Sequence, residues 1–136
     1  MRQAVLDPGV LVSALINPEG RPARLLTQAA GAEFEMVASP LLLEELEGVL
    51  LREKFRRYAG IDEVRDYLEF LRRLASVEPD PDEPAPISCP DPDDNYLLAL
   101  AYSQKAVLVS GDSDLLEIVS GAPILAPADF LSVGSL

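Results

Sequence analysis

Gln3-Ala-Val-Leu-Asp7 is the first of two stretches that decide the fold, and Ala106-Val-Leu-Val-Ser-Gly-Asp112 is the second. Each is a short apolar run that ends at or just before an aspartate. Glu35 to Ala38 and residues 123–125 are predicted as two further strands, and segments of helical length separate all four. Short apolar strands that alternate with helices indicate an α/β fold, with a parallel sheet covered on both faces.

The predicted helices are marked by their first residues. Ser39-Pro40 offers a serine N-cap and a proline at the first helical position, which predicts a helix to about Arg52. Asp91-Pro92 repeats this pattern and predicts a helix to about Gln104. The other helices are expected over residues 10–16, 22–30, 61–75, 113–119 and 127–131.

Two connecting segments have distinctive composition. Gly31 follows the predicted helix over 22–30, where we expect a glycine in the left-handed conformation to end it. Residues 78–90 hold five of the chain's twelve prolines together with several acids, and they predict an exposed, extended loop.

The length and composition are those of one globular domain, residues 1–136. The chain has 49% hydrophobic and 25% charged residues, which excludes a disordered protein. No apolar run approaches the ~20 residues of a membrane helix. Met1-Arg2 leads directly into a strand-like segment, so no signal peptide is expected. The single Cys89 cannot form an internal disulfide, which fits a cytoplasmic location.

The chain contains no histidine, and this excludes several kinds of site. Histidine-based catalytic triads, histidine-ligated zinc and histidine general bases cannot be present. Cys89 is better read as a small residue near a loop than as a catalytic thiol, because no histidine can activate it. Oxygen ligands remain, and these suit Mg²⁺ or Mn²⁺.

The net charge of −12 argues against a nucleic-acid binder when it is taken alone. Bound divalent cations would offset part of that charge, and the basic residues are grouped. They are pairing partners for nearby acids on solvated helix faces, or part of an anion-binding surface, and the sequence leaves both readings open. The groups are Arg52, Lys54, Arg56 and Arg57; Arg72 and Arg73; and Arg21 and Arg24.

Four acidic residues are candidates for one site because of where they fall in this pattern. Asp7 and Asp112 follow strands, and α/β sheets bind ligands beyond the carboxyl ends of their strands. Glu45 and Asp94 lie among leucines on predicted helices. Carboxylates that meet in one pocket repel each other unless their pKa values shift or a cation binds. A magnesium-type site is therefore the leading interpretation.

A helical wheel separates the glutamates of the 40–52 segment. Glu45 falls inside the apolar arc, Glu44 falls outside it, and Glu47 lies near its far edge. A buried carboxylate needs a partner, because an unpaired buried charge is costly. A glutamate at the edge of the core, or one paired with an arginine, remains an equal alternative to a ligand.

The wheel does not choose among Asp91, Asp93 and Asp94. Asp91 is most simply an N-cap, and all three acids favour the helix N-terminus through its dipole. In the same way, Asp112 or Ser113 could cap the next helix, and an acid in its first turn could be merely solvated. Each position alone therefore has a structural explanation, and it is the joint arrangement that points to function.

With these residues in place, the chain resembles the PIN-domain nucleases, particularly the VapC-like toxins of toxin–antitoxin systems. Four motifs carry the resemblance in order along nearly the whole chain. Each is weak alone, and their order and spacing make the case. They are Val5-Leu-Asp-Pro-Gly-Val-Leu-Val-Ser-Ala-Leu15, Ser39-Pro-Leu-Leu-Leu-Glu-Glu-Leu-Glu-Gly-Val-Leu50, Cys89-Pro-Asp-Pro-Asp-Asp-Asn-Tyr-Leu-Leu-Ala-Leu-Ala101 and Val109-Ser-Gly-Asp-Ser-Asp-Leu-Leu116.

The resemblance implies a three-layer α/β/α sandwich around a mostly parallel sheet, and a ribonuclease that cuts single-stranded RNA with Mg²⁺ or Mn²⁺. It implies that acids at the four family positions act as metal ligands and catalytic residues, with support from the hydroxyl of Ser110 and outer-shell charge from Asp114. The four acids are Asp7, Glu45, Asp94 and Asp112.

The resemblance also implies partners. A toxin has a cognate antitoxin protein, and family members form homodimers or higher oligomers, to which exposed apolar residues of the 61–75 helix could contribute. No membrane partner is implied.

The chain departs from the family pattern directly after the first acid. The family places Ser or Thr and then Asn there, whereas this chain has Pro8-Gly9, which offers no side-chain hydrogen bond. The alternative function is therefore a catalytically weak or inactive PIN module that binds RNA or a protein partner. A third reading, an aspartyl phosphoprotein built on Asp7, is weak because Gly9 stands where a phosphatase of the haloacid dehalogenase type has its second aspartate.

Overall fold

Five parallel strands form the central sheet, in the order β3-β2-β1-β4-β5. The parallel sheet expected from the alternating pattern is therefore confirmed. The inner strand β1 is buried on both faces, and Ala4, Val5 and Leu6 are all fully inaccessible to solvent. The strands are β1 (Gln3–Leu6), β2 (Glu35–Ala38), β3 (Ser76–Val77), β4 (Val107–Val109) and β5 (Ile124–Leu125).

The structure is a computed structural model that describes residues 1–117 and 123–134, with all side chains in these ranges except those of Asp114, Val133 and Gly134. Two of its helical elements are single 3₁₀ turns, η1 (Glu53–Phe55) and η2 (Pro92–Asp94). The α-helices are α1 (Pro8–Ile16), α2 (Arg21–Ala30), α3 (Pro40–Leu50), α4 (Ile61–Leu74), α5 (Asn95–Gln104), α6 (Ser113–Leu116) and α7 (Pro127–Gly134).

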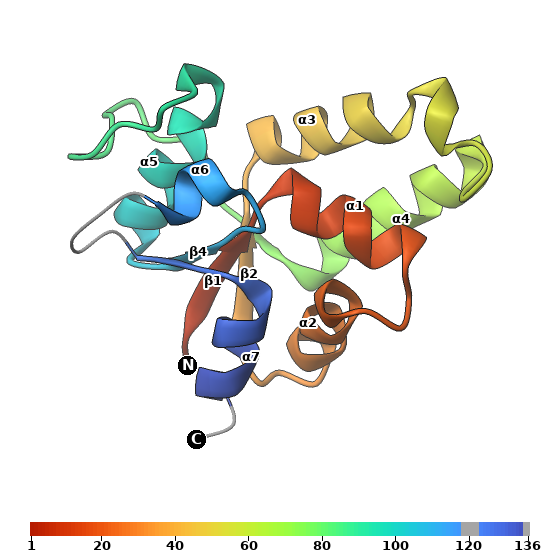
Figure 1. Cartoon of the computed structure of the whole chain (residues 1–136), viewed down its shortest axis with the longest axis horizontal. Helices are drawn as coiled ribbons and strands as arrows, with labels where there is room; N and C mark the ends of the chain where they lie inside the picture. Colours follow the sequence, from red (N-terminus) through yellow and green to blue (C-terminus); the bar gives the residue numbers. More distant parts are fainter. Residues whose placement is uncertain (118–122, 135–136) are drawn as a thin grey trace.

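Helices flank the sheet on both sides. Figure 1 shows α1, α2 and α4 on one side of the strands and α5 on the other. The buried apolar residues form one contiguous cluster that includes β1, β2 and β4 as well as the inner faces of these helices. This is the three-layer α/β/α arrangement, and it confirms the predicted fold class.

The register of β1 against β4 brings two of the predicted site segments together. Leu6 lies opposite Val109, and the Asp7 amide donates to the Val109 carbonyl over 3.1 Å. Because parallel strands end at the same edge of the sheet, Asp7 and Ser110 leave that edge side by side. The candidate site begins at this edge.

Two predicted N-caps, Ser39 and Asp91, are confirmed. The Ser39 hydroxyl accepts from the amide of Leu42 over 3.3 Å, with Pro40 in the first turn of α3. The Asp91 carboxylate accepts from the amide of Asp93 over 3.0 Å. The turn that Asp91 opens is the 3₁₀ turn η2, however, and α5 continues from it at Asn95.

The end of α2 differs from the prediction. Gly31 has φ of −84°, and Ala32 takes the left-handed conformation with φ of 59°. The amide of Glu33 donates to Gln28 over 2.9 Å and that of Ala32 to Ala29 over 3.0 Å, which is the Schellman pattern with Ala32 in the position that glycine favours. The prediction that Gly31 supplies the left-handed residue is therefore wrong by one position.

Other boundaries shift for local reasons. The helix expected to reach Arg52 ends at Leu50, where η1 follows, and the helix expected over 113–119 ends at Leu116, with residues 118–119 outside the described ranges. The strand β3 was not expected. The loop over residues 78–90 is anchored rather than free, since the Asp80 carboxylate accepts from the Leu41 amide over 3.0 Å.

Within residues 1–117 and 123–134, no helix is both long enough and apolar enough to cross a membrane.

Candidate functional site

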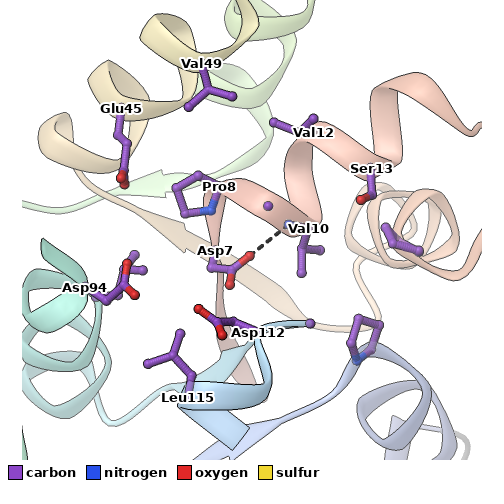
Figure 2. Close-up of a pocket in the computed structure, with 15 residues that line it drawn as sticks. Asp7, Pro8, Val10, Val12, Ser13, Glu45, Val49, Asp94, Asp112 and Leu115 are labelled. Atoms are coloured by element: carbon purple, nitrogen blue, oxygen red, sulfur yellow. Dashed lines mark hydrogen bonds between the residues drawn. The ribbon is translucent and has the colours of Figure 1, made fainter. Parts of the chain in front are cut away.

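A pocket of about 540 Å³ opens at the carboxyl edge of the sheet. All four predicted acids line it, and each comes from a different segment of the chain. Asp7 follows β1, Glu45 lies on α3, Asp94 ends η2, and Asp112 lies between β4 and α6. Figure 2 shows the four carboxylates directed toward a shared space. The structure therefore brings together the four residues that the sequence singled out.

Asp7 is the most buried of the four acids, at 6% exposed. One carboxylate oxygen accepts from the amide of Val10 over 2.8 Å, so Asp7 is the N-cap of α1 (Figure 2). The other oxygen accepts from the hydroxyl of Ser110. Each carboxylate oxygen has a second lone pair, so both can still face a ligand in the pocket.

Ser110 connects the first and the fourth acid. Its hydroxyl donates to the Asp7 carboxylate and accepts from the amide of Asp112 over 3.0 Å. Ser110 is fully buried directly after β4, so its rotamer is held by the sheet edge. This fixes the backbone that presents the Asp112 side chain, which is itself exposed. The hydroxyl of Ser110, predicted to support the site, thus contacts two of the four acids, and its supporting role stays a prediction.

Glu45 is held from the opposite wall of the pocket. The phenolic hydroxyl of Tyr96, on α5, donates to a Glu45 carboxylate oxygen. Burial, followed by this hydrogen bond and by the charges of Glu45 and Asp94, raises the pKa of Tyr96. Tyr96 therefore stays a protonated donor. Sequence reasoning missed this residue because its partner lies 51 positions away and no local pattern joins them.

The three acids at the start of α5 are separated by the structure. Asp91 and Asp93 are exposed, whereas Asp94 is half-buried, and among these three only Asp94 lines the pocket. Burial, and next to it the charges of Asp91, Asp112, Glu45 and Asp7, raise the pKa of Asp94 to about 6. The helical wheel could not make this choice because both faces of the segment carry leucines.

The pKa of Asp7 is raised as well. Burial raises the pKa of its carboxyl group, the hydrogen bonds from Ser110 and Val10 lower it, and the charges of Asp112 and Glu45 raise it again. The described lining of the pocket contains no lysine or arginine to offset these charges. A divalent cation would do so, and oxygen ligands alone suit a hard ion such as Mg²⁺ or Mn²⁺.

The carboxylates are not drawn into a tight cluster. Among the side chains that the structure describes, no group of three or more acidic or cysteine residues is close enough to form a ready metal-ligand set. The donor chemistry fits a hard cation, and binding one would require the side chains of the pocket to converge. Asp114, the predicted source of outer-shell charge, lies on α6 outside the described side chains.

Cys89 and the Pro8-Gly9 pair are the remaining residues that the sequence singled out. Burial raises the pKa of the Cys89 thiol to about 11, and its amide donates to the Asn95 side chain over 2.7 Å. Cys89 is thus a neutral thiol in a structural position. Pro8 and Gly9 both line the pocket, where neither presents a polar side chain.

Comparisons with known proteins bear on the family and the fold. A sequence profile of the PIN domain matches residues 3–114, a span that contains all four acids. The uncharacterised protein MJ1680 of Methanocaldococcus jannaschii is 35% identical over 118 residues, which cover 85% of this chain and 74% of the relative.

Two solved structures share the fold. VapBC2 from Rickettsia felis, crystallised bound to a DNA fragment from its promoter, matches with a TM-score of 0.64 and 13% identity, over 91% of this chain and 98% of its own. PAE2754 from Pyrobaculum aerophilum matches with a TM-score of 0.63 and 18% identity, over 98% and 97%. On the match to the family profile over most of its length, this chain belongs to the PIN-domain family.

Proposed function

We propose that this protein is a divalent-metal-dependent endoribonuclease that cuts single-stranded RNA, and that it is the toxin of a toxin–antitoxin pair. The observation that carries the proposal is the meeting of four carboxylates, from four separate segments, in one pocket without a basic residue in its described lining. PIN-domain membership supports nuclease chemistry for this site. The ribonuclease and toxin assignments go beyond membership and rest on the resemblance of the four motifs.

Asp7, Glu45, Asp94 and Asp112 would hold Mg²⁺ or Mn²⁺, directly or through water, and Asp114 would add charge outside them. A cation held this way lowers the pKa of a bound water and stabilises the charge that develops on phosphate oxygens. The chain has no histidine, so this chemistry does not call on a histidine base.

The protein's own residues contribute order and charge. Ser110 keeps the Asp7 carboxylate and the Asp112 backbone in a fixed relation, and Tyr96 keeps one Glu45 oxygen turned toward α5. The raised pKa of Asp94, about 6, means that this group is largely ionised above neutral pH. At lower pH, a metal ion has to compete with a proton for the carboxylate. Metal binding and cleavage should therefore both improve as the pH rises through this range.

The antitoxin proposal follows from the charge of the pocket. Four carboxylates without a basic neighbour in the described lining make a receptor for arginine side chains of a partner protein, and arginine–carboxylate pairs are short and bidentate. A partner that inserts an arginine here would both neutralise the pocket and block it. Co-purification with the product of an adjacent gene, lost in Asp112→Ala, would support this partner.

A second candidate is a PIN module that binds RNA or a protein without cutting. Pro8 and Gly9 favour it, because the pocket wall beside Asp7 offers no side-chain hydrogen bond to a substrate or to a water. The two functions differ in one measurable outcome, which is the formation of RNA fragments.

The test is incubation of end-labelled single-stranded RNA of mixed sequence with the purified protein in Mn²⁺, in Mg²⁺ or in EDTA. The proposal expects discrete fragments with a metal and intact RNA in EDTA. Intact RNA under every condition, together with metal binding in calorimetry, would assign the non-cleaving module instead. Fragments that form equally in EDTA would contradict the metal dependence.

A further inference from the structure

The basic segment, residues 52–58, lies just beyond the end of α3 and contains the turn η1. It carries four cationic residues and a single acid, on a chain whose net charge is −12. Its sequence, Arg52-Glu-Lys-Phe-Arg-Arg-Tyr58, places two aromatic residues among the basic ones. The nuclease site described above makes no use of this segment.

Two of its residues have structural roles. Phe55 is half-buried and packs against the hydrophobic core. Arg56 is half-buried as well, and its guanidinium donates to the Leu50 carbonyl at the end of α3, where a positive charge is favoured by the helix dipole. These two contacts anchor the segment to the body of the protein.

The other three cations face solvent. Arg52, Lys54 and Arg57 are all exposed. Lys54 Nζ lies 5.2 Å from the centroid of the Phe55 ring, and Arg57 Cζ lies 4.9 Å from the centroid of the Tyr58 ring. Contacts of this kind hold a cationic head in place without neutralising its charge.

The basic segment differs in this respect from the cations of α4. There, Arg73 pairs with Glu69 at 2.5 Å and Arg65 approaches Asp62 at 3.7 Å. Over residues 1–117 and 123–134, none of the ion pairs within 4.0 Å involves the segment's exposed cations. The pairing of basic residues with nearby acids, which the sequence left open, therefore applies to Arg65 and Arg73 of α4 and not to the exposed cations of the basic segment.

Helix α3 connects the basic segment to the acidic pocket. Glu45 and Val49 both line the pocket, and Arg52 follows Val49 by three residues. Figure 1 shows α3 running away from the sheet toward the yellow segment that follows it. At about 1.5 Å per residue, the helix carries the chain roughly 10 Å from Glu45 to the start of the basic segment. A strand of nucleic acid that enters the pocket can therefore continue along α3.

We propose that the exposed cations of the basic segment bind backbone phosphates of the single-stranded RNA that flank the bond held in the pocket. This inference rests on the proposed function, since it assumes an RNA substrate. A protein with twelve excess negative charges repels a polyanion except where fixed cations face it, and phosphate contacts are electrostatic and independent of sequence. The exposed ring of Tyr58 also suits a single strand, whose bases are free to stack.

The test compares two double variants with the same change of charge, Lys54→Gln with Arg57→Gln, and Arg72→Gln with Arg73→Gln. Binding of a fluorescein-labelled single-stranded RNA is followed by fluorescence anisotropy over a range of salt concentrations. EDTA is present throughout, and the RNA is checked afterwards for intactness. All four side chains are exposed, so both variants should melt within a few degrees of wild type.

For the basic-segment variant, the proposal expects affinity to fall by on the order of tenfold at low salt. It also expects the slope of log K against log salt to shrink by about 1.4, at about 0.7 per lost phosphate contact. The α4 variant should keep the wild-type slope. Equal losses in both variants would show a general charge effect and would overturn the proposal, as would unchanged affinity in both, or wild-type protein that binds no RNA.

An acidic protein segment is the rival occupant. If a labelled deca-glutamate peptide loses affinity for the basic-segment variant while RNA does not, the segment belongs to a protein interface and the proposal is overturned. The assay measures binding without cleavage, so it separates the two claims. Wild-type protein that binds RNA through this segment and never cuts it would leave this inference standing while the nuclease proposal fails.

Discussion

Tyr96 and Glu45 join the two helices that face each other across the acidic pocket. The phenolic hydroxyl of Tyr96 on α5 donates to the Glu45 carboxylate on α3, and the raised pKa of Tyr96 keeps that donor protonated. The hydrogen bond fixes one carboxylate oxygen and leaves the other for a ligand. Tyr96 is thus a positioning residue for Glu45 in the proposed metal site.

Replacing Tyr96 with Phe should weaken the binding of Mn²⁺ by about 10- to 100-fold, because a ligand without its supporting hydrogen bond must be ordered when the ion binds. Calorimetry measures the affinity directly. Tyr102→Phe, on the same helix, is the control and should bind Mn²⁺ as the wild type does. Equal affinity for wild type and Tyr96→Phe would show that the hydrogen bond does not serve metal binding.

The same pair allows a double-mutant cycle. Glu45→Gln alone should reduce Mn²⁺ affinity, and adding Tyr96→Phe to it should reduce the affinity little further, because the hydroxyl acts through the carboxylate. Fully additive losses would mean that Tyr96 supports the site by another route.

Ser110→Ala should destabilise the protein and disturb the first acid. The substitution leaves a buried Asp7 oxygen and the Asp112 amide without their shared partner, which costs about 1–3 kcal/mol in the free energy of unfolding. It also removes a contact that lowers the pKa of Asp7, so that group should ionise at still higher pH. Urea unfolding measures the cost, with the exposed Ser88→Ala as a control that should stay within about 0.5 kcal/mol of wild type.

Because the pKa of Asp94 is raised, the stability of the wild-type protein should depend on pH in a way that the stability of Asp94→Asn does not. Its folded pKa of about 6 lies above the ordinary value of 3.8, so the folded protein favours the protonated form. Stability from this group is present at low pH and is lost as the pH rises from about 4 through 6. In EDTA, the melting temperature of Asp94→Asn relative to wild type should therefore rise over that interval.

The exposed Asp93→Asn serves as the control for this experiment and should show no such trend. Saturating Mg²⁺ should reduce the loss of wild-type stability over this pH interval, since a bound cation offsets the repulsion among the carboxylates of the pocket. A melting-temperature difference between Asp94→Asn and wild type that is constant from pH 4 to pH 7 would contradict the assigned shift.

The two left-handed residues offer a test of the fold. Ala32 and Lys105 have φ of 59° and 55°, where a side chain costs about 1–2 kcal/mol. Ala32→Gly and Lys105→Gly should each therefore raise the free energy of unfolding by up to about 1 kcal/mol, after the greater freedom of glycine in the unfolded chain is taken into account. Ala23→Gly, within α2, should lower it by about 1 kcal/mol instead. If both substitutions lowered the free energy of unfolding, the left-handed conformations of Ala32 and Lys105 would be contradicted.

Most of the framework could be predicted because its signals are local. The strands β1 and β2 were predicted to the residue, since each is a short, buried run that ends just before a helix. The helix after β2 has a recognisable start at Ser39, whereas the helix expected over residues 10–16 begins two residues earlier, at Pro8. The strand β3 is only Ser76–Val77, and it is defined by its pairing with β2 rather than by its own composition. The left-handed Ala32 was hidden for a similar reason, because a neighbouring glycine offered the more favourable residue type.

The site divides in the same way. Asp7 and Asp112 were found from their positions after strands, and Glu45 from its place among leucines. The helical wheel alone could not separate Asp94 from Asp91 and Asp93; the family resemblance selected it, and the packing of α5 gives the physical reason, because among these three only Asp94 lines the pocket. Tyr96 and the unpaired state of the basic segment depend on contacts between distant segments, which no local pattern reveals.

Asp112→Asn tests the central claim most directly, because it removes one charge from the acidic pocket with almost no change of shape. Wild-type protein and the variant are incubated with the same end-labelled RNA in Mn²⁺, with the exposed Asp93→Asn as a matched control. The account predicts that wild type and Asp93→Asn release fragments, while Asp112→Asn leaves the RNA intact and melts no lower than wild type. Cleavage by Asp112→Asn at the wild-type rate would contradict the assignment of this pocket as the nuclease site.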